Sequence, residues 1–261
     1  MPMRLLTMNM YKNVGKQLGL FAVLTVVSIQ AFAADAIQAV PLIKLKSDSL
    51  QLNKICVDLN LTCSEGANLW KKKASNDGKV YLIDSTPQLI ELIQEKKNYK
   101  VVNSWRFKTY QHHNKNSEDG ELGNDGVEIF PAFYPLNRQK FAIAIVQHWS
   151  TGYSGGGKSE QFADFVMLEP KGVYKLALPD VPFYSYEMIR ACFSEKDYKT
   201  SPHCHDETGS SLSIQFKDIG KSYYQWTLNY TDFTWEAFKP EKDKVVEKHR
   251  VVVMPFEQKK K

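Results

Sequence analysis

The chain has 261 residues, of which 43% are hydrophobic and 12% aromatic, and its formal net charge is +5. This composition supports a sizeable core and excludes an intrinsically disordered chain. Three basic residues and no acidic residue lie within residues 1–33, so the rest of the chain carries a net charge of only +2. A chain so close to neutral has no strong field to attract nucleic acid, and we expect no nucleic-acid partner.

Residues 1–33 have the pattern of a secretory signal peptide. Two lysines precede an apolar run at residues 18–29, and the small-x-small sequence Ala-Phe-Ala follows at residues 31–33. We expect cleavage near Ala33, export to the periplasm or the medium, and no membrane span in the mature form; the alternative is an uncleaved anchor. The sequence therefore predicts a single β-rich exported domain at residues 34–261.

All four cysteines follow the signal sequence. An even number of cysteines in an exported protein is typical of disulfide bonds. Three pairings are formally possible, and we expect Cys56–Cys63 and Cys192–Cys204 because each closes a short loop within one segment. The spacings contain no Cys-x-x-Cys motif, so they do not indicate a thiol oxidoreductase.

The helix signals lie in the first third of the mature chain. Thr86 can cap a helix, Pro87 suits its first position, and an apolar face would follow from Leu89, Ile90, Leu92 and Ile93. We therefore expect a helix at Thr86–Lys97 and a second one around Ser64–Lys73. Short strands are expected nearby at Leu42–Leu45 and Val80–Ile83.

The remainder of the chain is a series of β-strand patterns separated by short turns. Within Tyr223–Tyr230, for example, large apolar side chains alternate with polar ones, as a half-buried strand requires. Strands are expected at residues 101–110, 141–149, 162–168, 173–178, 183–193, 212–216, 223–230 and 251–256. Short connections favour antiparallel pairing. The expected fold class is α+β, predominantly antiparallel sheet with one or two short helices near the N-terminal third.

The segment Gly152–Ser159, G-Y-S-G-G-G-K-S, matches two catalytic patterns. The phosphate-binding P-loop needs a helix after its lysine, but the following residues alternate as a strand does. The elbow G-x-S-x-G of α/β-hydrolases would present Ser154 to a histidine base and a carboxylate. Asp180 or Asp232 and His203, His205 or His249 follow in the required order. A secreted serine hydrolase using Ser154, Asp232 and His249 is therefore the alternative function.

A β-hairpin explains both matches. Residues 141–149 and 162–168 would pair, and residues 150–161 would form a long glycine-rich tip, which is a common place for function. Amphipathic aromatic side chains beside such a tip suit a protein interface. We therefore expect a partner-binding surface made of His148, Trp149, Tyr153, Ser154, Gly155, Gly156 and Lys158.

The sequence contains two further, less favoured candidates for a binding site. His203 and His205 could share a zinc ion with Asp206 or Glu207, but Cys204 is better used in a disulfide, so no metal is expected. The aromatic residues of segment 223–235 could stack on sugars, which keeps a glycan-binding protein as a further alternative.

The preferred function is non-catalytic and needs no cofactor. We expect an exported, periplasmic protein that binds another protein of the cell envelope through its hairpin. A small exported protein with disulfides and a protruding loop is a plausible design for an enzyme inhibitor or a toxin-neutralising immunity protein.

Overall fold

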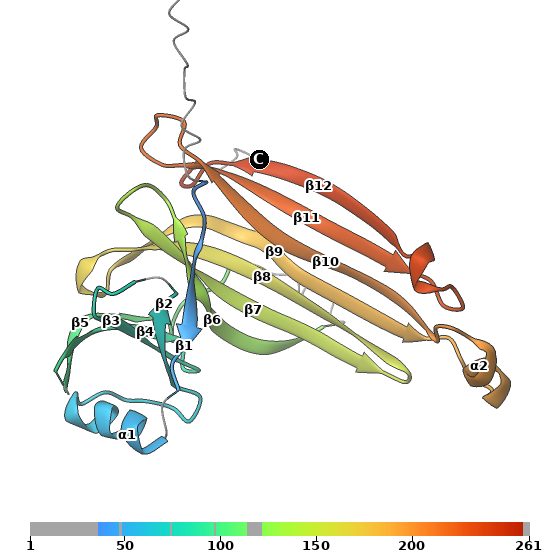
Figure 1. Cartoon of the computed structure of the whole chain (residues 1–261), viewed down its shortest axis with the longest axis horizontal. Coiled ribbons are helices and arrows are strands. Elements are labelled where there is room, and N and C mark those ends of the chain that lie inside the picture. The colour runs from blue at the N-terminus through green and yellow to red at the C-terminus, as the bar shows by residue number, and fades with distance from the viewer. Residues whose placement is uncertain (1–35, 47–48, 74, 97, 114–121, 258–261) are drawn as a thin grey trace, which may run out of the picture. The chain divides into compact units, whose positions relative to one another are not determined.

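A computed structural model describes residues 36–46, 49–73, 75–96, 98–113 and 122–257. Within these ranges, twelve strands form one antiparallel sheet in the order β12-β11-β10-β9-β8-β7-β6-β1-β2-β3-β4-β5 (Figure 1). The fold is therefore mostly antiparallel β, as the alternation and short turns predict. The expected signal peptide lies outside the described residues. Neither α-helix found in these ranges is long and apolar enough to cross a membrane.

The N-terminal part of the sheet is a meander of four strands. It consists of β2 (Asn68–Lys72), β3 (Lys79–Asp84), β4 (Gln88–Glu95) and β5 (Asn98–Arg106). Strand β1 (Val40–Lys44) pairs with β2 on one side and with β6 on the other, so it joins this meander to the rest of the sheet. Helix α1 (Ser49–Asp58) follows β1, and the disulfide Cys56–Cys63 fastens its last turn.

The C-terminal part is a meander of seven longer strands. They are β6 (Gly123–Pro135), β7 (Phe141–Tyr153), β8 (Gly156–Leu168), β9 (Tyr174–Arg190), β10 (His205–Lys217), β11 (Gln225–Trp235) and β12 (Val245–Val253). The connections include the 3-10 turns η2 (Pro170–Gly172) and η3 (Glu241–Asp243) and the helix α2 (Glu195–Thr200).

Three apolar clusters hold these parts together. Side chains of α1 pack on one face of the N-terminal meander, against residues such as Leu82 and Ile90. The other face, including Leu89 and Trp105, packs against β6, β7 and β8. The third cluster, built around Trp226 and Phe165, joins β6–β9 to β10 and β11.

The expected helix at Thr86–Lys97 is wrong, because residues 88–95 form strand β4. Its apolar residues mimic a helical face since the strand is buried on both sides: Leu89 faces β6–β8, whereas Ile90 and Leu92 face α1. A short strand buried on both faces cannot be told from a helix by periodicity.

The helix expected around Ser64–Lys73 is also wrong, because β2 occupies residues 68–72. In the described ranges the α-helices are α1 and α2. The start of α2 is marked in the sequence, because Ser194 and Asp197 form a reciprocal capping box there. Both expected disulfides are present, Cys56–Cys63 and Cys192–Cys204. Structural disulfides persist in oxidising compartments, so these two bonds indicate that the protein is found in such a compartment.

Candidate functional site: the end of the sheet at the β7–β8 turn

The hairpin of β7 and β8 confirms the expected antiparallel pairing, but its tip is much shorter than residues 150–161. The two strands stay paired from Ala142 opposite Met167 as far as Tyr153 opposite Gly156, so only Ser154 and Gly155 form the turn. A strand follows the glycines. Neither the P-loop nor the hydrolase elbow has the helix that its chemistry needs.

The glycines shorten the tip because they let backbones approach closely. A Cβ atom at Gly156 would lie 2.0 Å from the carbonyl oxygen of Met188 on β9. The amide of Arg190 donates a 2.7 Å hydrogen bond to the carbonyl oxygen of Gly155, whose φ of +92° suits glycine. The tip is therefore fastened to β9 and is not a free loop that could enter a cleft.

Only part of the expected binding set reaches the surface. Tyr153, with 39% of its side chain exposed, donates a 3.1 Å hydrogen bond to Glu187, and Ser154 is exposed beside it. Gly155, Gly156 and Lys158 are half-buried, and Lys158 forms an ion pair with Glu160. Trp149 is only 5% exposed and His148 is half-buried. These last two cannot make the exposed base of a binding loop.

The connection from β9 to β10 adjoins the tip and exposes large apolar side chains. Ile189, which pairs with Gly156, is exposed, and so are Phe193, at 73%, and Tyr198 on α2. The disulfide Cys192–Cys204 closes this connection at its base. The expected surface therefore extends beyond the hairpin, onto residues that sequence reasoning did not select.

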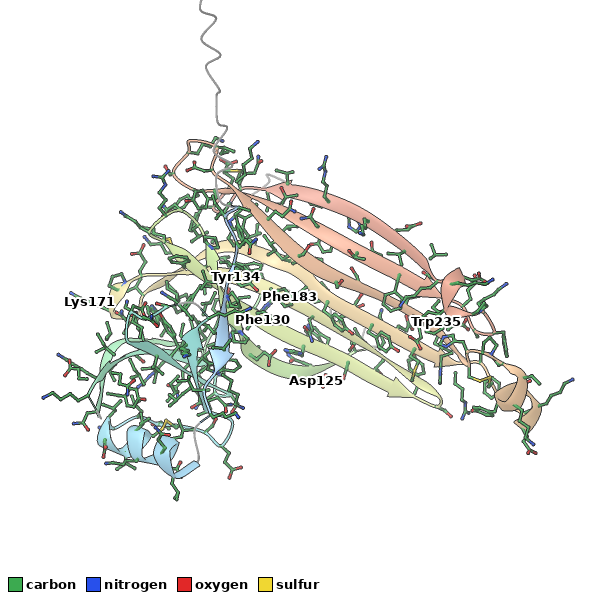
Figure 2. All side chains as sticks on the ribbon, viewed as in Figure 1. Asp125, Phe130, Tyr134, Lys171, Phe183 and Trp235 are labelled. Atoms are coloured by element: carbon green, nitrogen blue, oxygen red, sulfur yellow. A yellow bond between two sulfur atoms is a disulfide. The ribbon has the colours of Figure 1, made fainter. Side chains whose placement is uncertain are left out.

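The connection from β11 to β12 is hydrogen-bonded to the β9–β10 connection and to the start of β10. The amide of Phe238 donates a 2.8 Å hydrogen bond to the carbonyl oxygen of His203, and the amide of Ala237 donates one of 2.8 Å to Asp206. Trp235, labelled in Figure 2, stacks on the His203 ring with 3.5 Å between centroids. Phe238 is exposed. We call the exposed side chains on or next to these three connections the distal surface: Tyr153, Ile189, Phe193, Tyr198 and Phe238.

The alternative catalytic residues are not brought together. Asp232 and His249 face each other on β11 and β12, with 2.8 Å between Oδ2 and Nδ1. Ser154 lies at the β7–β8 turn, and β9, β10 and β11 separate β8 from β12 in the sheet. Within the described ranges, no hydrogen bond links Ser154 to either residue. A histidine oriented by a carboxylate is present, but Ser154 is not beside it.

A second histidine–carboxylate arrangement lies inside the fold, at Asp164 on β8. This fully buried carboxylate accepts hydrogen bonds from the Tyr110 hydroxyl at 2.8 Å, the His113 amide at 3.0 Å and the Asp180 amide at 2.7 Å. His113 Nδ1 also lies 2.8 Å away. Burial and the Asp164 charge raise the pKa of Tyr110. These hydrogen bonds anchor the segment after β5 to β8 and β9. Both carboxylate oxygens of Asp164 already accept hydrogen bonds.

The aromatic residues of segment 223–235 do not form an exposed sugar platform. Tyr224, Trp226 and Tyr230 are buried in the third apolar cluster, and Tyr223, Phe233 and Trp235 are half-buried. A cavity of about 510 Å³ lies elsewhere, between the N-terminal meander and β6–β8. Four of its charged groups pair with one another, Lys79 with Glu91 at 2.6 Å and Lys140 with Glu169 at 3.3 Å, and Lys72 pairs with Asp77 at 3.6 Å. The distal surface is therefore the stronger candidate.

Comparison of the chain with protein-family models, with curated proteins and with solved structures finds no match.

Proposed function

We propose that the protein is an exported, non-catalytic binding protein that contacts another protein through the distal surface. One observation carries the proposal: large apolar side chains are exposed on or next to three connections at one end of the sheet, where the β7–β8 turn is bonded to β9 and the β11–β12 connection is bonded to the β9–β10 connection. Exposed apolar side chains that gather in one place are typical of protein interfaces. Aromatic residues are also enriched among those that contribute most of the binding energy.

The rigidity of the distal surface supports this function. The disulfide Cys192–Cys204 closes one connection, and the hydrogen bond from Arg190 to Gly155 fastens the hairpin to β9. Binding by a surface that is already ordered loses less conformational entropy than binding by a mobile loop. A preorganised surface of this kind suits an inhibitor of an enzyme or an immunity protein that neutralises a toxin.

The compartment fits the same proposal. Two disulfides and a signal-like N-terminal sequence both favour a protein that acts after export, in the periplasm or the medium. A hydrolase would need Ser154 beside a histidine, and the separation of the β7–β8 turn from His249 disfavours it. The partner we propose is another protein of the cell envelope.

Photocrosslinking in cells that express the full chain tests the proposal. A photoreactive phenylalanine analogue replaces Phe193 or Phe238 in turn, and the control is Val57, which is 78% exposed and likewise adjoins a disulfide cysteine. We expect one discrete adduct from Phe193 and Phe238 and none from Val57. The change Tyr198→Ser should lower the yield of that adduct. An equal yield from Val57, or no adduct at the distal positions, would overturn the proposal.

A further inference from the structure

Three potential metal ligands converge where β10 begins. His205 and Glu207 are two residues apart on β10, so their side chains leave the same face of the strand. His203 precedes them in the disulfide-closed connection. One ligand atom from each of the three side chains lies within 4.8 Å of the other two. Of the two acidic residues considered from the sequence, Glu207 is the one that lies close to both histidines.

The strongest sign of a ligand is the state of His203. Its side chain is 7% exposed, and its Nε2 atom is buried without a hydrogen-bond partner in the described part of the chain. Oε1 of Glu207 lies 3.7 Å from this atom, which is too far for a hydrogen bond. Buried polar atoms in native proteins are nearly always satisfied, and a bound ion is one way to satisfy them. The Nε2 atom points at a carboxylate oxygen that could share a cation with it.

The ring of His203 is also held in place. It lies parallel to the Trp235 indole, with an interplanar angle of 2°, and its backbone carbonyl accepts the hydrogen bond from Phe238. The next residue, Cys204, is fixed in the disulfide with Cys192. Packing that fixes the orientation of a ligand is a regular feature of metal sites. His203 therefore presents Nε2 in a defined direction.

The spacing suits a small tetrahedral ion. Zinc binds histidine nitrogen and carboxylate oxygen at about 2.0–2.2 Å, which places neighbouring ligand atoms roughly 3.4 Å apart. The 3.7 Å between His203 and Glu207 is close to this value, and side-chain rotation can reduce the remaining separations of up to 4.8 Å. Two histidines and one carboxylate form a zinc ligand set that leaves one position open.

The surroundings of Glu207 support the carboxylate's role. Tyr186, on the neighbouring strand β9, interacts with the Glu207 side chain. A neutral hydroxyl that donates to a ligating carboxylate holds one of its oxygens and leaves the other for the ion.

We propose that His203, His205 and Glu207 form a binding site for a divalent transition-metal ion, with zinc as the ion that fits best. Imidazole ligands favour zinc, copper and nickel over magnesium and calcium, which take oxygen ligands. The site lies at the same end of the sheet as the distal surface, next to the backbone of Phe238, but it does not depend on the proposed protein partner. A metal there would clamp the β9–β10 connection to β10.

Calorimetric titration of the full mature chain with zinc tests the site, using oxidised protein without a histidine tag and freed of metal by a chelator. We expect one zinc per chain, and an affinity at least tenfold weaker in His205→Gln and in Glu207→Gln. These positions are preferred to His203, whose buried ring supports the fold. The control is His249→Gln, because His249 pairs with a carboxylate outside the cluster.

Two further readouts separate a site from loose surface binding. Zinc should raise the midpoint of thermal unfolding of the wild-type chain and of His249→Gln, but not of Glu207→Gln. Cobalt should give the visible absorption of a tetrahedral ion in the wild type and in His249→Gln, but not in Glu207→Gln. Absence of saturable zinc binding, or an affinity that the His205 and Glu207 variants leave unchanged, would overturn the inference. Neither result bears on the crosslinking test.

Discussion

The change Tyr110→Phe tests whether the buried Asp164 carboxylate stabilises the fold through its hydrogen bonds. It removes the hydroxyl that donates to Asp164 at 2.8 Å and keeps the ring, which packs against Phe107 and Tyr174. A hydrogen bond to a charged group contributes about 1.5–3 kcal/mol to stability. We therefore expect the free energy of unfolding to fall by about 2 kcal/mol.

Equilibrium denaturation in urea, with the disulfides intact, measures the change in stability. For a domain of this size, 2 kcal/mol corresponds to a fall of roughly 4–8 °C in the midpoint of thermal unfolding. The control is Tyr198→Phe, whose ring is exposed on α2, and it should alter stability by less than about 0.5 kcal/mol. If Tyr110→Phe changes stability as little as the control does, Asp164 does not depend on this donor and the reasoning fails.

Two further predictions concern the hairpin and the acid stability of the chain. Gly156→Ala should destabilise the protein by roughly 1–3 kcal/mol or more, since its Cβ would meet the Met188 carbonyl, whereas Gly152→Ala meets nothing within 4 Å and should change little. Equal stability of the two variants in urea would contradict the close packing of the tip on β9. Burial alone would raise the pKa of Asp84, but hydrogen bonds led by those from Ser64 outweigh it and lower the pKa. A lowered folded-state pKa gives stability at neutral pH that is lost as the pH falls through it, so wild type should lose more stability than Asp84→Asn between about pH 5 and pH 2. Parallel losses in the two proteins would refute that prediction.

Features that depend on local sequence were predictable. The disulfide pairing follows from cysteine spacing, because Cys56–Cys63 and Cys192–Cys204 each close a short loop. The antiparallel hairpin follows from the strand-like alternation after Lys158. Its exact length did not follow, because it depends on how closely β9 can approach Gly156, a contact between distant parts of the chain.

Features that depend on tertiary burial were not predictable. Strand β4 has two consecutive apolar residues, Leu89 and Ile90, because both of its faces are covered. That coverage depends on the whole fold and not on the local sequence. The same limit applies to the candidate site. Trp149 was expected at the surface and is buried, whereas Phe193 and Phe238 are exposed although nothing in their sequence neighbourhood marks them.

The order of the strands leaves β12 and β5 at the two edges of the described sheet, and each edge is blocked in its own way. The middle of β12 exposes four charged or titratable side chains in succession, Glu247, Lys248, His249 and Arg250. The β8–β9 connection lies against β5, where Lys171 donates its amide to the Asn103 side chain and Trp105 donates to the Glu169 carbonyl. Exposed charge and covering loops both discourage a foreign strand from joining a sheet. Recognition by β-strand addition is therefore disfavoured at both edges, and a partner would have to recognise side chains rather than free backbone groups.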